Sequence, residues 1–218
     1  MKILIASANP KKLRELREQL AVLAPGLEGP DGAPVEFIGP GGVGGLPEVI
    51  EDGHSFRENA AKKARSAARA TGLWSLGDDS GLEVDSLDGA PGIYSARFSG
   101  PGATDERNNA LLLERLAGVP EERRGARFVC ALALARPDQD LALEVEGTCR
   151  GRILEAARGT RDFGYDPLFL FTEAGTEATG YTFAELESAV KALVSHRGRA
   201  IRRLLSALPQ ILAGSPAG

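Results

Sequence analysis

Short apolar runs alternate with helix-patterned segments along this chain, and this alternation limits the possible fold more than any other feature. Residues 2–6 form a continuous apolar run of strand length. Apolar residues then recur at helical spacing, at Leu13, Leu16 and Leu20. The corner between the two segments holds Asn9, a preferred N-cap residue, and Pro10, which suits the first helical position. The sequence therefore predicts a buried strand that turns directly into a helix.

The same alternation continues to the end of the chain. A helix is predicted over residues 55–72, where Ser55 and Glu58 form a capping box and Gly72 supplies the stop. Further strands are predicted at 35–38, 73–76 and 168–171, helices at 104–117, 183–193 and 197–208, and a β-hairpin at 127–135 and 141–149. The glycine-rich segment 39–45 lacks the ending of a P-loop and is interpreted as a flexible connection. This order of elements predicts an α/β fold with a mixed β-sheet and flanking helices.

Length and charge narrow the class of protein further. The 218 residues suffice for one domain, or one domain with an added lobe, and we expect residues 213–218 to form a flexible tail. The 26 basic and 30 acidic side chains give a formal net charge of -4, which disfavours nucleic acid as a partner. No apolar run is long enough to span a membrane and no signal-peptide pattern opens the chain, so we expect a cytoplasmic protein without a membrane partner.

Two cysteines, Cys130 and Cys149, fall in the predicted hairpin and could lie near each other. In a reducing compartment, two buried thiols are favoured over a disulfide. Their spacing is not that of a zinc site.

The corner at residues 7–12 is a candidate phosphate site. Free backbone N–H groups and the positive end of the helix dipole attract anions at a helix N-terminus. Asn9 and Lys12 could add a side-chain donor and a positive charge. A simple capped helix with solvated lysines would explain the same residues.

Asp78 and Asp79 are a second candidate, placed between a predicted strand end and the pair Ser80-Gly81. Adjacent carboxylates repel each other unless a cation neutralises them, and hard oxygen ligands suit magnesium bound together with substrate phosphates. The same residues favour turns, so an exposed tight turn is the alternative. Further acids that could reach the same ion are Glu48, Glu51 and Asp52.

Two segments near the C-terminus could hold a flat heterocyclic base. In the loop 163–167, Phe163 could stack on a base while Asp166 accepts a hydrogen bond from a ring N–H. In Ser195-His196-Arg197, positive residues stand in the first turn of a predicted helix, where an anionic or carbonyl-bearing ligand would relieve their unfavourable interaction with the dipole. A core aromatic pair and a solvated basic face are the alternatives.

Taken together and in order, these segments resemble the inosine and xanthosine triphosphate pyrophosphatase family (dITP/XTP pyrophosphatases), whose members clear aberrant purine nucleotides. The similarity covers nearly the whole chain and is densest at residues 78–82 and 89–100. It also includes the segments 7–15, 51–60, 163–167, 191 and 195–197. The resemblance implies a single pyrophosphatase domain over residues 1–218, with a long mixed sheet, two lobes around a central nucleotide-binding cleft, and assembly as a homodimer.

The resemblance also implies a reaction and a role for each site residue. The reaction is magnesium-dependent hydrolysis of ITP, dITP, XTP and dXTP to the nucleoside monophosphate and pyrophosphate. Asp79 would be the proton acceptor and, with Glu51, a ligand of Mg2+. Residues expected to bind the purine nucleoside triphosphate are Ser7, Ala8, Asn9, Pro10, Lys11, Lys12, Ser80, Phe163, Gly164, Tyr165, Asp166, Lys191, His196 and Arg197. An acceptor and a cationic donor that face the base would favour hypoxanthine and xanthine over adenine.

The sequence departs from the family pattern in two places. The acidic pair that commonly precedes the family lysine is absent before Lys191, and the glycine-rich insertion makes Glu48 an alternative to Glu51 as a metal ligand. A pyrophosphatase with broader base preference and a non-hydrolytic nucleotide-sensing module are the competing hypotheses. Paired acids near phosphates argue against a pure binder.

Overall fold

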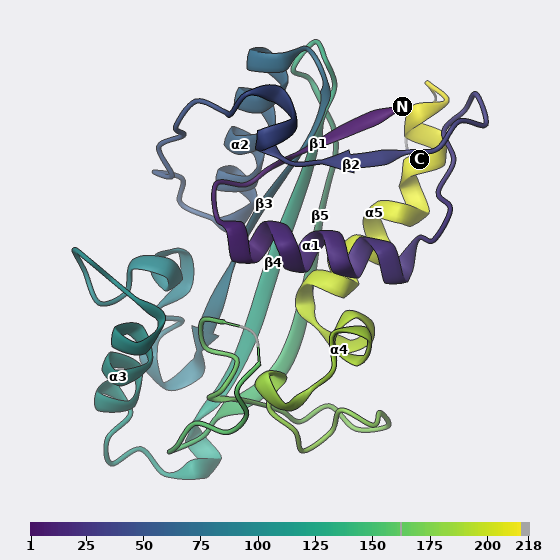
Figure 1. Cartoon of the computed structure of the whole chain (residues 1–218). Coiled ribbons are helices and arrows are strands. Elements are labelled where there is room, and N and C mark those ends of the chain that lie inside the picture. Colours follow the sequence, from purple (N-terminus) through teal and green to yellow (C-terminus); the bar gives the residue numbers. More distant parts are fainter. Residues whose placement is uncertain (162, 215–218) are drawn as a thin grey trace. The chain divides into compact units, whose positions relative to one another are not determined.

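The computed structural model describes residues 1–161 and 163–214, so most of the expected C-terminal tail lies outside the described residues. Six strands form one sheet in the order β2-β1-β3-β4-β5-β6 (Figure 1). The strands are β1 (Lys2–Ala6), β2 (Glu36–Ile38), β3 (Trp74–Val84), β4 (Gly125–Ala135), β5 (Leu141–Ile153) and β6 (Phe169–Phe171). The α-helices are α1 (Pro10–Leu23), α2 (Phe56–Thr71), α3 (Asp105–Arg115), α4 (Ser188–Val194) and α5 (His196–Leu212).

The sheet is mixed, as the sequence predicts. Strand β1 pairs in parallel with both β2 and β3, whereas β6 runs antiparallel to β5. Strands β4 and β5 are sheet neighbours joined by a tight turn, in which the Arg136 N–H donates to the Asp140 carbonyl at 2.9 Å. The predicted hairpin is therefore confirmed, and its second strand continues to Ile153.

Several boundaries differ from the sequence prediction. The glycine-rich segment contains a short 3-10 helix, η1 (Pro40–Val43). The helix predicted over residues 183–193 is divided into a 3-10 turn, η5 (Phe183–Glu185), and α4. The Glu185 carboxylate accepts a hydrogen bond from the Thr182 N–H at 2.7 Å and caps the start of η5. The division follows because Leu186 and Glu187 are extended. The last helix runs four residues further than predicted, to Leu212.

The chain divides into two compact units. Unit 1 contains residues 1–79, 130–147 and the described residues from Arg197 onward, and unit 2 contains the described residues of 80–129 and 148–196. The division passes through β3 between Asp79 and Ser80, so β3, β4 and β5 each contribute residues to both units. The candidate site residues are consequently distributed over both units.

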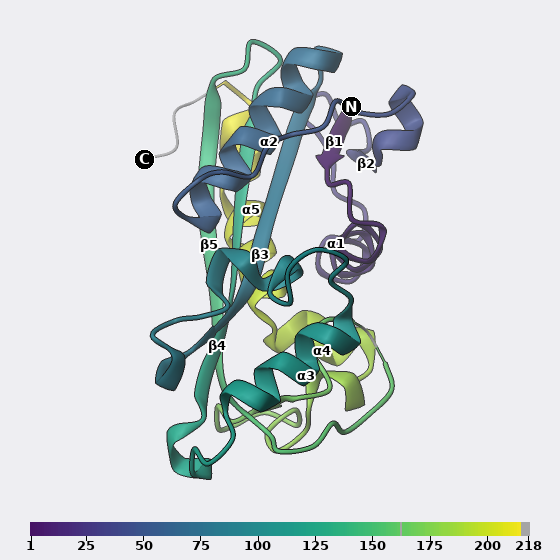
Figure 2. The same ribbon diagram turned by 90° about the vertical axis from the view of Figure 1, so that its left-hand side faces the viewer.

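In unit 1, the sheet is covered by helices on both faces. Alternation along β1 sends Ile3 and Ile5 into a core with Leu16 of α1 and Leu204 of α5. Leu4 and Ala6 pack on the other face, with Ala67 of α2. Figure 2 views unit 1 from the side of α2, with α5 behind the sheet.

In unit 2, the core is aromatic. The rings of Phe128 and Phe169 have centroids 4.6 Å apart, and Phe183 lies 5.0 Å from Phe169. Leu112 of α3 and Val194 of α4 pack into the same cluster. Within residues 1–161 and 163–214, none of the helices is both long and apolar enough to cross a membrane.

Candidate functional site

The corner between β1 and α1 is capped from within the chain. The side-chain Oδ1 of Asn9 accepts hydrogen bonds from the N–H groups of Lys11 and Lys12 at 2.9 and 3.2 Å, which confirms Asn9 as the N-cap. Pro10 contributes no N–H, and the Leu13 N–H bonds to the Asn9 carbonyl at 2.9 Å. The expectation of free amides at this helix end is therefore wrong for Lys11 and Lys12, because the Asn9 side chain engages their N–H groups.

The other residues of this corner differ in exposure. Ser7 is buried and its hydroxyl accepts from the Asn9 N–H at 3.3 Å, whereas Ala8, Pro10 and Lys11 are exposed. The Lys12 side chain points to the sheet, with its Nζ 3.9 Å from Asp79 Oδ1. The corner therefore presents the ammonium of Lys12 and the positive helix end to an anion.

Asp78 and Asp79 do not lie in an exposed turn, so that alternative is wrong. They sit in the middle of β3, and each is almost completely buried. Successive side chains of a strand point to opposite faces. Asp78 accordingly faces the same side as Leu76, toward Arg197 of α5, and Asp79 faces the side of α2.

Asp79 is surrounded by donors from α2. Its Oδ2 accepts from the Asn59 amide at 3.3 Å, and its Oδ1 lies 3.0 Å from the Lys63 Nζ. Burial raises the pKa of the Asp79 carboxyl above its usual value, despite the opposing charges of Lys12 and Lys63. A carboxyl with a raised pKa among cationic donors has the character of a general base held close to a polyanion site.

Gly77 allows α2 to approach this strand closely. A Cβ at residue 77 would lie 2.0 Å from the Ala60 carbonyl oxygen and 2.9 Å from the Ala64 nitrogen. Only glycine fits at this distance without displacing the helix. The close approach places Asn59 and Lys63 against Asp79.

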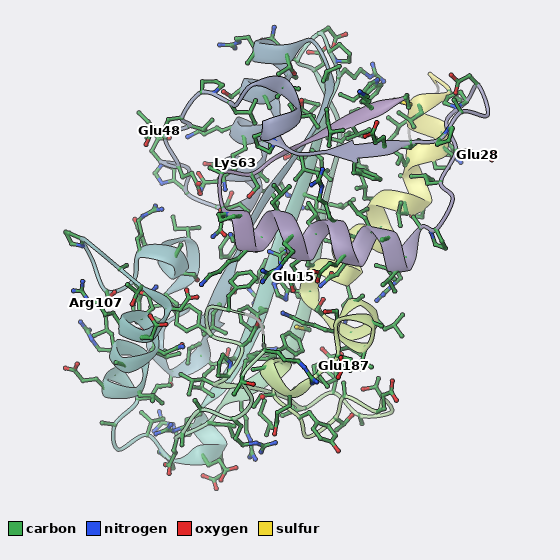
Figure 3. All side chains as sticks on the ribbon, viewed as in Figure 1. Glu15, Glu28, Glu48, Lys63, Arg107 and Glu187 are labelled. Atoms are coloured by element: carbon green, nitrogen blue, oxygen red, sulfur yellow. The ribbon has the colours of Figure 1, made fainter. Side chains whose placement is uncertain are left out.

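Glu51 joins this group through Lys63. Its Oε2 lies 2.9 Å from the Lys63 Nζ, the same ammonium that contacts Asp79. Burial lowers the pKa of Lys63, but the charges of Asp79 and Glu51 outweigh burial and raise it. Glu48 is exposed on the same loop, and Figure 3 labels it together with Lys63 and Glu15.

On the opposite face of β3, Asp78 pairs with Arg197. The Arg197 Nε donates to Asp78 Oδ2 at 3.1 Å, and its NH1 pairs with the Glu15 carboxylate of α1. Burial alone would raise the pKa of Asp78, but the charges of Arg197 and Lys12 reverse the effect and hold it well below its usual value. The two adjacent aspartates therefore have opposite pKa shifts.

In unit 2, the loop 163–166 packs against Lys191 of α4. The Lys191 Nζ donates to Asp166 Oδ2 at 2.8 Å, and both side chains are buried. The same Nζ lies 5.8 Å from the Phe163 ring centroid and 5.6 Å from that of Phe183. The structure thus brings together a planar ring, an acceptor and a cation, which is the set expected around a heterocyclic base.

Two members of this loop have supporting contacts. The Tyr165 hydroxyl is buried and donates to the Ser95 carbonyl at 2.9 Å, and burial raises the pKa of Tyr165. The Asn109 amide of α3 donates to the Gly164 carbonyl at 2.9 Å, and Gly164 has a positive φ of 64°. These contacts hold the shape of the loop between Phe163 and Asp166.

His196 is the last residue of unit 2, and its ring lies among aromatic side chains. It stacks on Phe128 with centroids 4.7 Å apart, and Phe183 is 6.4 Å away. Its Nδ1 is 4.0 Å from the Cys149 sulfur. Ser80, the first residue of this unit, is buried. Cys130 and Cys149 are both buried and form no disulfide within the described residues, which confirms the expectation of reduced thiols.

Comparison with known proteins decides the family. The sequence model of the Ham1 family matches residues 3–207. A dITP/XTP pyrophosphatase from Anaeromyxobacter sp. (strain Fw109-5) is 45% identical over 97% of this chain and 98% of its own length. One from Exiguobacterium sp. (strain ATCC BAA-1283 / AT1b) is 48% identical over 98% of this chain and 100% of its own length. The chain belongs to the Ham1 family.

Solved structures of other Ham1-like proteins share the fold. The HAM1 protein from Coxiella burnetii superposes with a TM-score of 0.78 at 36% identity, covering 95% of this chain and 98% of its own. The nucleoside-triphosphatase / dITP/XTP pyrophosphatase from Mycobacterium abscessus gives a TM-score of 0.70 at 45% identity, covering 95% of this chain and 100% of its own. The mixed α/β fold is therefore that of the Ham1 family.

A divalent cation fits this Ham1 chain. No group of three His, Cys, Asp or Glu side chains gathers at metal-ligand spacing within residues 1–161 and 163–214. Glu51 and Asp79 nevertheless converge on one ammonium, at 2.9 and 3.0 Å, so two hard carboxylates already share a cation. Mg2+ commonly takes one or two protein carboxylates and completes its shell with water and substrate phosphates.

Sequence reasoning assigned no role to several residues that contact the candidate site. Asn59 lies in the family-like segment 51–60 and Lys63 just after it, but their contacts with Asp79 come from the packing of α2 on Gly77. Ser95 and Asn109 support the loop 163–166 from elements far away in the sequence. Ser95 lies in the family-like segment 89–100, which was a signal for it, whereas no local pattern marks Asn109.

Proposed function

We propose that this chain hydrolyses aberrant purine nucleoside triphosphates (ITP, dITP, XTP and dXTP) to the nucleoside monophosphate and pyrophosphate. The observation that carries the proposal is Asp79, a buried carboxylate with a raised pKa, held between Lys12, Lys63 and Asn59. Curated relatives that align over nearly the full chain are named dITP/XTP pyrophosphatases, and this supports the choice of substrate.

The cations of unit 1 are suited to the triphosphate. Lys12 at the start of α1 and Lys63 in α2 both lie within 4 Å of Asp79 Oδ1. Ammonium groups next to the reacting phosphoryl group stabilise the negative charge that develops on its oxygens. Asp79 accepts a proton from a water that attacks the α-phosphorus, and the bond to the bridging oxygen of the β-phosphate breaks. Pyrophosphate leaves with the electron pair of that bond, and no covalent enzyme intermediate is needed.

We propose Mg2+ as the cofactor, held by Glu51 and Asp79. When bound, the ion would neutralise part of the charge on the phosphates and orient them. The contacts of Glu51 and Asp79 with a common ammonium support this assignment over one that uses the exposed Glu48. Lys63 would then exchange its carboxylate partners for phosphate oxygens.

The loop of unit 2 is proposed to hold the base. Phe163 offers a ring face, Asp166 an acceptor for a ring N–H, and Lys191 a donor for a 6-oxo group. Adenine carries a 6-amino group and lacks the ring N–H, so it would leave the lysine and the carboxylate unpaired. His196 and Ser80 complete the proposed contacts with substrate.

Product analysis tests the proposed function directly. The protein is incubated with Mg2+ and ITP, and we expect one pyrophosphate for each IMP. Stepwise release of orthophosphate, or binding without turnover, would overturn the proposal. Turnover of XTP, GTP and dTTP in parallel measures the base preference, and equal rates for all of them would indicate a general pyrophosphatase.

The proposal extends to assembly and location. By resemblance to the family, we propose a homodimer, for which light scattering should give twice the chain mass of 22.9 kDa. Because the substrates belong to the nucleotide pool, we place the protein in the cytoplasm. We propose no nucleic-acid partner, on the grounds of its net charge of -4.

A further inference from the structure

Asn59 of α2 uses both ends of its side-chain amide inside unit 1. The side chain is fully buried, with an exposed fraction of 0%. Its Oδ1 accepts a hydrogen bond from the Gly53 N–H at 2.8 Å, and its Nδ2 donates to Asp79 Oδ2 at 3.3 Å. A buried amide must satisfy both its donor and its acceptor. This one side chain thereby joins the loop before α2 to the middle of β3.

The Gly53 contact fixes the orientation of the Asn59 amide. A backbone N–H can only donate, so it must face the amide oxygen, and the amide NH2 group is left for Asp79. Leucine has a similar size and offers neither end. Aspartate would keep the acceptor for Gly53 but would place a second carboxylate against Asp79. The two contacts at position 59 therefore require an asparagine.

The loop that Asn59 holds also carries Glu51. Further contacts join this loop to α2, namely Glu51 with Lys63 at 2.9 Å, Asp52 with Lys62 at 2.5 Å, and the His54 N–H with the Glu58 carboxylate at 2.8 Å. Asp52, His54 and Glu58 are exposed, whereas the hydrogen bond from Gly53 to Asn59 is buried. Exposed ion pairs add little stability. The buried contact, two residues after Glu51, is therefore the firmer anchor of the loop.

Gly53 permits this anchor because it has no side chain. A Cβ at residue 53 would lie 2.5 Å from Asn59 Oδ1 and 2.9 Å from the Glu58 Cβ. Both distances are shorter than van der Waals contact, so a methyl group there would push the loop away from Asn59. Gly53→Ala would therefore disturb the loop end of the bridge and leave the amide at position 59 in place.

At the other end of the bridge, the amide and the ammonium groups contact different oxygens of Asp79. Asn59 bonds to Oδ2, whereas the Lys12 and Lys63 ammonium groups lie 3.9 and 3.0 Å from Oδ1. Oδ1 is therefore the oxygen that faces positive charge. Lys63 would compete with a metal ion, because it contacts both Glu51 and Asp79 Oδ1. The neutral amide of Asn59 holds the carboxylate by Oδ2 and leaves Oδ1 to a cation.

We propose that Asn59 is a positioning residue for the divalent cation: it holds Asp79 directly and the Glu51 loop through Gly53, and so sets the relative position of the two carboxylate ligands. This inference rests on the proposed function, because it takes Glu51 and Asp79 to be those ligands. Residues that orient metal ligands without touching the ion contribute about 10- to 100-fold to metal affinity.

Binding of Mn2+ tests the inference without turnover. The free ion gives an EPR signal that is lost on binding, and Mn2+ takes the same oxygen ligands as Mg2+. For Asn59→Leu, we expect the affinity for Mn2+ to fall by about 10- to 100-fold. Gly53→Ala should weaken it by a smaller factor, since it moves the loop alone. The double variant should bind no more weakly than Asn59→Leu, because both changes break the same contact.

Magnesium tripolyphosphate provides a second measurement, because this ligand has the phosphates of the substrate and no base. The ion binds together with the phosphates, so calorimetric titration should rank the variants in the same order as Mn2+ binding does. If Asn59→Leu fails to fold, Gly53→Ala carries the test in both measurements.

Two control variants separate metal positioning from a loss of stability. Asn108 of α3 is also buried and uses both amide ends, accepting from the Ser99 N–H at 2.8 Å and donating to the Ala96 carbonyl at 3.2 Å. Asn108→Leu should lower the free energy of unfolding, as Asn59→Leu does, but should bind Mn2+ as the unaltered protein does. Lys62→Gln removes the exposed ion pair with Asp52 and should also leave the affinity for Mn2+ unchanged.

The outcomes distinguish this inference from the proposed function. It is overturned if Asn59→Leu or Gly53→Ala binds Mn2+ or magnesium tripolyphosphate as tightly as the unaltered protein, or if the unaltered protein does not bind Mn2+. It is also overturned if Asn108→Leu loses as much affinity for Mn2+ as Asn59→Leu. Absence of ITP hydrolysis, with the Mn2+ pattern intact, would refute the proposed function and leave the positioning role standing.

Discussion

Two neighbouring carboxylates on β3 have different tasks because the strand turns them to opposite faces. Asp79 faces Asn59 and Lys63, and burial raises its pKa. Asp78 faces Arg197, which together with Lys12 lowers its pKa. One residue of displacement along a strand is therefore enough to separate a candidate base from a buried structural anion.

Replacing the candidate base should remove turnover and preserve binding. For Asp79→Asn, we expect kcat for ITP to fall by about 10²- to 10⁴-fold, the usual contribution of a positioned general base. Pyrophosphate release measures the rate, and tripolyphosphate titration measures the retained binding. Asp85→Asn, at a half-exposed acid paired with Arg150, is the matched control and should keep the full rate. A normal rate in Asp79→Asn would refute the assignment.

Asp78 should make stability depend on acid pH. Its pKa in the folded chain is below the unfolded value of 3.8, so in that range the unfolded state binds more protons and stability rises with pH. The contribution is complete above the unfolded pKa and is lost as the pH falls toward the folded one. Urea unfolding between pH 3 and 7 should therefore show a steeper acid loss for the unaltered protein than for Asp78→Asn. Parallel curves would contradict the ion-pair description.

At the scale of elements, the position of α2 depends on Gly77, which has no side chain. Gly77 lets the backbone of α2 approach β3 so closely that a Cβ would overlap the Ala60 carbonyl. The helix N-cap adds to this placement, since the Ser55 hydroxyl accepts from the Glu58 N–H at 3.1 Å. The Glu58 carboxylate accepts from the His54 N–H at 2.8 Å. A capping box would use the N–H of the N-cap residue Ser55 instead, so the predicted box is formed only in its Ser55 half.

A methyl group at residue 77 should destabilise the fold. For Gly77→Ala, we expect the free energy of unfolding to fall by about 1–3 kcal/mol, because the helix must move to remove the overlap. The displaced α2 should also lower the rate of ITP hydrolysis, since it carries Lys63. Gly41→Ala is the matched control, because a Cβ there meets nothing within 4 Å, and its unfolding free energy should change little. Urea unfolding measures both, and equal stabilities would refute the close approach.

Elements with local signals could be predicted, and those set by distant contacts could not. Asn9, Pro10, Ser55 and Gly72 mark helix ends through their own chemistry, and the helices begin or end there. The middle of β3 reads as a turn, because Asp, Ser and Gly favour turns. It is a strand because β3 continues there beside β4 in the sheet, beyond the residues 74–77 that pair with β1. Its acids are neutralised by Lys63 and by Arg197, which is 119 positions away from Asp78. For the same reason, the residue types of the site were predictable and the partners of Asp78 were not.

At the scale of the whole molecule, the two compact units share their strands. Each of β3, β4 and β5 passes from one unit into the other, so neither unit contains any of these three strands in full. The candidate phosphate residues and the candidate base residues are thereby assigned to different units of one chain.

Shared strands should make unfolding cooperative. Trp74 is the single tryptophan and lies in unit 1, whereas the three tyrosines, Tyr94, Tyr165 and Tyr181, all lie in unit 2. Tryptophan fluorescence and tyrosine absorbance therefore report the two units separately. We expect coincident urea transitions by both probes, as for a two-state protein. Transitions with different midpoints would show that the units unfold independently.

The Asn9 cap also bears on how quickly a ligand can be captured. The amide oxygen of Asn9 accepts from the N–H groups of Lys11 and Lys12, which an incoming phosphate would also seek. To bind these two N–H groups, an anion must therefore displace the Asn9 amide oxygen. We therefore expect the association rate to lie below the encounter rate, by the same factor for every nucleotide whichever base it carries.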